Sequence, residues 1–159
     1  MRTTSTHIYF YKNADYLSNF FPSKFVLKNI TFCCMEQYIM YSKAKLFDDQ
    51  VMSQNIMNTT IPYNMKQYGR QVKNFNEHIW LQNRDQILFE GLCAKFTQNE
   101  ELRQLLIDTS PKILVEASPT DVIYGVGLSQ TDDKILNENN WRGQNVLGKM
   151  LMRVRTDIM

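Results

Sequence analysis

The sequence predicts a mostly helical α+β fold with a small β-sheet, formed by a single domain over residues 1–159. Apolar residues recur at helical spacing through the middle of the chain, whereas short segments before and after that stretch resemble strands. With 159 residues, of which 43% are hydrophobic and 12% aromatic, the chain is long enough for one packed core and short for two. Helices and strands segregated along a chain are typical of the α+β class.

Strands are expected first along the chain. The segment HIYFYK (7–12) has strand composition. The segments KFVL (24–27) and ITFC (30–33) are separated only by Lys28-Asn29, and two residues suffice for a hairpin loop. We therefore expect a β-hairpin directly before the first helix.

Five segments have apolar residues at helical spacing: 35–47, 48–58, 61–72, 76–98 and 101–109. Asp48 and Asp49 open the second segment, where the helix dipole favours acids. Pro62 lies near the start of the third, and Asn76 is suited to cap the fourth. The fifth stops before Pro111. After it, we expect a strand at 112–118, a glycine-containing turn region at 121–128 and a last helix at 145–155.

Composition excludes several classes of protein. The net charge of +2, with both signs interspersed, provides no concentrated basic surface for nucleic acid. Three cysteines form neither an even disulfide framework nor a C-x-x-C metal motif, and His7 and His78 lack a shared ligand set. No run of about 18 apolar residues occurs. We expect a soluble, cytoplasmic protein without a metal, a cofactor, a membrane partner or an obligate protein partner.

Two charged residues interrupt the apolar face of the first predicted helix. At about 100° per residue, Glu36, Met40, Lys43 and Phe47 share one face. Glu36 could be an ordinary acid of a first turn, and Lys43 could extend its amine into water. Because the pair is too far apart for a simple i,i+4 ion pair, we expect both side chains to line a small-ligand pocket.

Similar alternatives apply further along the chain. Trp80 and Arg84 are four residues apart, so the guanidinium can lie beside the indole or reach a phosphate, unless they are a core tryptophan and a surface arginine. Glu116 and Asp121 are two further carboxylates before a Gly-x-Gly at 125–127, which marks an ordinary turn more often than a phosphate site.

Seven motifs occur in order with compatible spacing: L-S-N-F-F-P (17–22), M-E-Q-Y-x3-K-A (35–44), G-R-x-V (69–72), the tryptophan at 80, A-K-F-x-Q-N (94–99), L-V-E-A-S-P-x-D-x-I-Y-G-V-G-L (114–128) and W-x-G-x-N-x-L-G-x2-L-M-x-V-R (141–155). Together they resemble the NADAR family, which is associated with NAD and ADP-ribose metabolism. No single motif is specific, but the ordered set is, and it extends over essentially the whole chain.

The resemblance implies a compact, mainly helical fold and hydrolysis of an N-glycosidic bond. Substrates of such proteins include phosphoribosylamino-pyrimidine intermediates of riboflavin synthesis and ADP-ribose attached to guanine in nucleic acid. The family's motif residues fall on Glu36, Lys43, Trp80 and Asp121. This chain departs from many relatives in having Tyr124 where they have tryptophan, and Val126 where some have an acid.

The expected chemistry suits these residue types. Breaking an N-glycosidic bond requires an anion near the sugar and a proton donor near the base. We expect Glu36 to stabilise the oxocarbenium ion or activate water, and Asp121 to act as the acid or to orient ribose hydroxyls. Lys43 could bind a phosphate or hydroxyl, or attack the anomeric carbon. The residues expected to bind substrate are Asn19, Phe20, Arg70, Trp80, Arg84, Lys95, Glu116, Tyr124 and Gly125.

Two other functions remain open on the sequence alone. A binding module could keep an ADP-ribose pocket without turnover, which Tyr124 and Val126 would permit. A helical interaction protein is the other alternative, although polar residues at apolar positions count against it.

Overall fold

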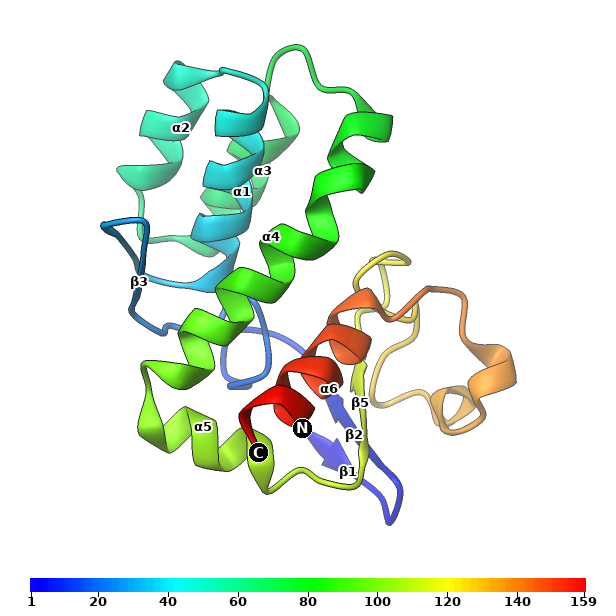
Figure 1. Cartoon of the computed structure of the whole chain (residues 1–159). Helices are drawn as coiled ribbons and strands as arrows, with labels where there is room; N and C mark the ends of the chain where they lie inside the picture. The colour runs from blue at the N-terminus through cyan, green and yellow to red at the C-terminus, as the bar shows by residue number, and fades with distance from the viewer. The chain divides into compact units, whose positions relative to one another are not determined.

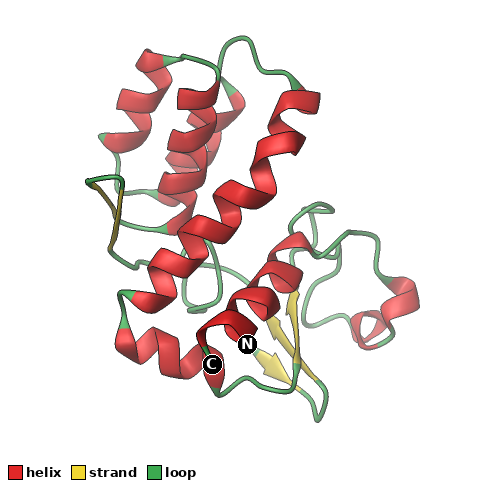
Figure 2. Cartoon of the chain, in the orientation of Figure 1, coloured by secondary structure: helices red, strands yellow, loops and turns green.

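The computed structural model describes all residues, 1–159, and divides them into two compact units. The first unit combines both ends of the chain, residues Met1–Phe21 and Glu100–Met159, and the second is the continuous segment Pro22–Asn99. Six helices and small sheets make up the fold, which confirms the predicted α+β class (Figures 1 and 2).

The segment Pro22–Asn99 begins with the predicted hairpin. Strands β3 (Phe25–Leu27) and β4 (Ile30–Phe32) pair in antiparallel register. Lys28 and Asn29 form the two-residue loop, with positive φ angles of 51° and 63°. This left-handed pair matches the twist of a hairpin, which explains why so short a loop suffices.

Four helices follow the hairpin: α1 (Met35–Leu46), α2 (Gln50–Met57), α3 (Pro62–Arg70) and α4 (Glu77–Thr97). Helix α1 packs against the other three, and Figure 1 shows α4 as the long helix beside it. The core between α1, α2 and α3 contains Cys34, Ala44, Ile56, Met65 and Val72. Burial raises the pKa of the Cys34 thiol to about 12, as expected of a cysteine packed as a small apolar residue.

The ends of these helices follow local chemistry. Pro62 occupies the first turn of α3, and the Asn76 side chain accepts a hydrogen bond from the backbone N–H of Ile79, as predicted. Helix α2 begins later than predicted, because Asp48 has a positive φ of 55° and Asp49 is the N-cap. The two acids therefore precede the first turn of α2, and Asp49 acts as a hydrogen-bond acceptor from Met52 N.

The unit formed by both chain ends contains a three-stranded sheet in the order β1-β2-β5. Strand β2 (His7–Phe10) pairs antiparallel with β1 (Arg2–Thr3) and parallel with β5 (Ile113–Glu116). Strand β1 was not predicted, because two residues are too few to show an alternating pattern.

Two helices and two short 3₁₀ segments complete this unit. They are α5 (Glu100–Ile107), η1 (Asp133–Leu136), η2 (Glu138–Asn140) and α6 (Val146–Ile158). Helix α6 packs on β5, and Tyr9, Val115, Val126 and Ile135 belong to one apolar cluster. The turn region predicted at 121–128 contains neither helix nor strand.

Candidate functional site

Four expected site residues come from three helices: Glu36 and Lys43 from α1, Arg70 from α3 and Trp80 from α4. Glu36 is only 7% exposed, although it is ionisable. Burial lowers the pKa of the Lys43 ammonium below its usual range; Glu36 opposes this change in pKa, and Arg70 on α3 adds to it. The Lys43 Nζ atom also lies 6.0 Å from the centre of the Trp80 ring. The structure thus gathers Glu36, Lys43, Arg70 and Trp80.

An aromatic residue that sequence reasoning missed belongs to this group. The centre of the Phe75 ring lies 4.5 Å from Lys43 Nζ, within the range of a cation–π contact. Phe75 also packs edge-on against Phe47, with ring centres 5.4 Å apart. It precedes the helix and has no helical periodicity of its own. No signal in the sequence could therefore place it beside Lys43.

Two expected phosphate partners, Arg84 and Lys95, lie on α4 and are largely or completely buried. Arg84 Nε donates a hydrogen bond to Asp85 Oδ1 at 3.1 Å, and its side chain is largely buried. Lys95 is 0% exposed, and burial lowers the pKa of its ammonium to about 7. Phosphate binding by Arg84 or Lys95 stays a prediction.

A second group of expected residues lies around the loop that follows β5. Asp121 Oδ1 accepts hydrogen bonds from the backbone N–H groups of Ile123 and Tyr124, at 2.8 and 2.9 Å. One oxygen of this carboxylate is therefore occupied in shaping the loop, and a role of Asp121 toward substrate stays a prediction. A methyl group at Gly125 would lie 2.9 Å from the carbonyl oxygens of Glu116 and Asp121, so glycine is needed for this close approach.

Residues 142–147 hold this loop by backbone contacts. The N–H groups of Arg142 and Gly143 both donate to the carbonyl of Val126. A methyl group at Gly143 would collide with the Gly125 carbonyl oxygen and lie 2.7 Å from Val122 Cα. The glycine in the W-x-G-x-N motif is thus explained by the close packing of two backbones.

Asn19 and Phe20 belong to a separate turn of the same unit. Asn19 is buried, and its side-chain oxygen has no hydrogen-bond partner in the structure. Because a buried acceptor without a partner is costly, this oxygen is suited to a donor on a ligand. Phe20 is half-buried, and its N–H donates to Ser18 Oγ.

The family-model comparison matches the NADAR domain over residues 9–159. The chain belongs to the NADAR family. The predicted resemblance is therefore confirmed over almost the whole length. The YbiA protein of E. coli, solved by NMR, shares the NADAR fold at a TM-score of 0.78 and 28% identity, over 98% of this chain and 86% of that one.

Curated relatives of this NADAR protein include enzymes. N-glycosidase R617 of Acanthamoeba polyphaga mimivirus is 43% identical over 122 residues, 77% of this chain and 72% of that protein. Protein irg-1 of Caenorhabditis elegans is 37% identical to this chain and matches 98% of this chain and 81% of that protein. N-glycosidase Npun_R5314 of Nostoc punctiforme is 29% identical over 95% of this chain and 92% of its own length. The names of the viral and the Nostoc punctiforme relatives agree with the expected hydrolysis of N-glycosyl bonds.

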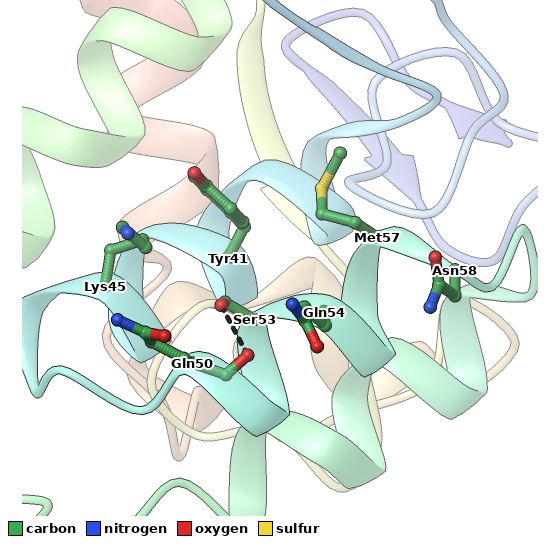
Figure 3. A pocket seen from close by; sticks show the side chains of 7 residues that line it. All are labelled: Tyr41, Lys45, Gln50, Ser53, Gln54, Met57 and Asn58. Carbon is green, nitrogen blue, oxygen red and sulfur yellow. Dashed lines mark hydrogen bonds between the residues drawn. The ribbon is translucent and has the colours of Figure 1, made fainter.

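An open pocket of about 400 Å³ lies between α1 and α2 of the NADAR chain (Figure 3). Seven residues line it, and all except Met57 have a polar group: Tyr41, Lys45, Gln50, Ser53, Gln54, Met57 and Asn58. Tyr41 and Lys45 lie on the side of α1 opposite to Glu36 and Lys43, given 100° per residue. The pocket contains no carboxylate, so it lacks the anion that an oxocarbenium ion would need.

No helix of the protein combines the length and the apolar character needed to cross a membrane. The structure also contains no cluster of three or more His, Cys, Asp or Glu side chains that could hold a metal ion.

Proposed function

We propose that this NADAR protein is an N-glycosidase that hydrolyses the bond between a base and a phosphorylated ribose or ADP-ribose. The observation that carries the proposal is the buried carboxylate of Glu36 on the same helix face as the amine of Lys43. Relatives named N-glycosidase support the reaction class. A relative named riboflavin biosynthesis protein, from Vibrio vulnificus and 26% identical over 95% of this chain, supports one class of substrate.

The assigned roles follow from where charge develops during the reaction. As the C1′–N bond breaks, positive charge builds on the sugar and the electron pair moves to the base. Glu36 stabilises the positive sugar or activates water, and burial strengthens its electrostatic effect. Trp80 offers a flat face to the base, while the expected role of Asp121 stays a prediction.

Lys43 takes part through its amine. In the covalent route, neutral Lys43 attacks C1′, the C1′–N bond breaks, and the base leaves with the electron pair and gains a proton. The attached sugar opens to an imine, which water hydrolyses to the phosphorylated ribose or ADP-ribose and the original amine. The lowered pKa of Lys43 favours this route, because a larger fraction of the amine is neutral near pH 7.

Two substrate classes suit this site. A phosphoribosylamino-pyrimidine and an ADP-ribosylated guanine each join a phosphorylated ribose to a ring through nitrogen. Both present a base for stacking and phosphate groups for cations. The exposed guanidinium of Arg70, beside Lys43, is the cation best placed for a phosphate.

The test is to incubate purified protein with each substrate and to follow release of the free base by mass spectrometry. We expect release from at least one substrate. In Glu36→Gln, which keeps the shape of the side chain, the rate should fall about a hundredfold or more, because one charge acting in the transition state is lost. The melting temperature should stay near that of the wild type.

Two results would count against this function. If ADP-ribose or ribose 5-phosphate stabilises the protein thermally while neither glycoside releases its base, the chain is a binding module. If Glu36→Gln turns over at the wild-type rate, the carboxylate is structural.

A further inference from the structure

Phe75 is an exposed aromatic residue whose ring contacts Lys43 and Phe47. It lies between α3 and α4, and 45% of its surface is exposed. Its ring meets the Phe47 ring at an interplanar angle of 67° and lies 4.5 Å from the Lys43 ammonium.

Hydrogen bonds on both sides of Phe75 fix the segment that carries it. Two residues earlier, the N–H of Lys73 donates to Asp49 Oδ2 at 2.9 Å. The same carboxylate accepts from Met52 N through Oδ1 at 3.0 Å, so Asp49 joins this segment to the start of α2. One residue later, Asn76 caps α4. Phe75 is therefore anchored at both ends despite its exposure.

The fixed ring matters because a lysine side chain is flexible. The four-carbon stem of Lys43 loses rotamer entropy when its amine is held in one place. The charged groups that act on the amine are Glu36 on its own helix and Arg70 on α3. Attraction to Glu36 and repulsion from Arg70 are coulombic and therefore do not by themselves select one direction of approach for the amine. Two ring faces, those of Phe75 and Trp80, supply a weak attractive surface that restricts it.

We propose that Phe75 is a positioning residue, whose ring holds the Lys43 amine in place on the face of α1 that also contains Glu36. The inference rests on the proposed glycosidase function for its catalytic consequence, but the contact itself does not. Phe47 supports the ring from the end of α1, only four residues after Lys43. Helix α1 and the segment before α4 thus enclose the amine from two directions.

The first test needs no turnover. Trace labelling of lysines with acetic anhydride, read peptide by peptide by mass spectrometry, reports how freely each amine reacts. In Phe75→Leu, the reactivity of Lys43 should rise about two- to fivefold, the equivalent of losing one exposed cation–π contact. The other lysines serve as the internal reference. Phe75→Tyr, which restores an aromatic face, should return Lys43 to the wild-type reactivity.

The second test measures catalysis on the substrate that releases its base. Phe75→Leu should lower kcat about tenfold or more with little change in KM, because a misplaced amine slows the chemical step. Phe75→Tyr should retain the wild-type kcat. Tyr63→Leu, an exposed aromatic residue on α3, is the matched control and should behave as wild type.

The outcomes separate the positioning role from other roles. Unchanged Lys43 reactivity in folded Phe75→Leu overturns the proposal. A raised KM with an unchanged kcat also overturns it, since that result marks a ring that contacts substrate. If wild type shows no turnover but the labelling changes as expected, the positioning contact stands while the glycosidase function fails.

Discussion

Glu36 and Lys43 occupy opposite ends of one short helix, and each charge lies at the end that favours it. Glu36 is in the first turn of α1 and Lys43 is in the last. The positive N-terminal end of a helix dipole stabilises a carboxylate and the negative end an ammonium, by about 0.3–1 kcal/mol each. This arrangement offsets part of the cost of burying Glu36 and of enclosing Lys43 among aromatic rings.

The role of Lys43 can be decided by chemical trapping. If Lys43 attacks the sugar, borohydride added during turnover should reduce the imine to a stable ribosyl-lysine. The adduct should appear as a mass increase on the peptide that contains residue 43. In Lys43→Arg the adduct should be absent and turnover largely lost, because arginine keeps the charge but is no nucleophile. Absence of an adduct during demonstrated turnover, together with an active Lys43→Arg enzyme, would contradict the covalent route.

Lys95 should make stability depend on pH. Its pKa is lowered from 10.5 to about 7 by burial, so between these values the unfolded chain binds a proton that the folded chain has released. The free energy of unfolding of wild type should therefore rise with pH, relative to Lys95→Met, by at most about 1.4 kcal/mol per pH unit. Urea titrations of both proteins from pH 6 to pH 10 would measure this. Parallel pH profiles would show that Lys95 stays charged in the folded protein.

At the scale of elements, Asn145 connects α6 to the sheet. It is 2% exposed, has a left-handed backbone (φ 53°) and directly precedes α6. Its side chain donates to the carbonyl of Leu114 at 2.9 Å and accepts from the N–H of Glu116 at 3.0 Å. The side chain thereby takes the place of a neighbouring strand along β5.

Asn145→Ala should destabilise the protein by roughly 2–4 kcal/mol, because two buried backbone groups lose their partners. Asn139→Ala, at an exposed position of η2, is the matched control and should change stability by about 0.5 kcal/mol or less. Chemical denaturation of the two variants and wild type provides the comparison. Equal stability of Asn145→Ala and wild type would mean that water replaces both hydrogen bonds.

Local chemistry explains which elements were predictable. The Lys28-Asn29 loop, the cap at Asn76 and the shared face of Glu36 and Lys43 each depend on residues close in sequence, and the structure contains all three. The hydrogen bonds of Asn145 and the contact of Phe75 with Lys43 join residues far apart in sequence. No periodicity encodes such pairs, so they were found only in the folded chain.

At the scale of the whole molecule, we propose that residues 1–159 unfold as one domain. The two tryptophans allow a direct test, because Trp80 lies in the segment Pro22–Asn99 and Trp141 in the unit formed by both chain ends. Trp141→Phe leaves Trp80 as the reporter of the segment Pro22–Asn99, and Trp80→Phe leaves Trp141 as the reporter of the unit formed by both chain ends. For each variant, the urea transition followed by fluorescence should coincide with that followed by circular dichroism. If the fluorescence and circular dichroism transitions have different urea midpoints, residues 1–159 form two domains that unfold separately.

The parallel pairing of β2 with β5 has a consequence for the chain as it is synthesised. Phe10 pairs with Glu116, so β2 leaves the ribosome long before its partner and has only the two residues of β1 beside it. Its apolar sequence, Ile8-Tyr9-Phe10, offers an open strand edge that other chains can join. Nascent chains stopped at Asn99 should therefore aggregate and sediment in larger amounts than chains whose α6 has already left the ribosome. Equal sedimentation of both would show that the early strand is protected in another way.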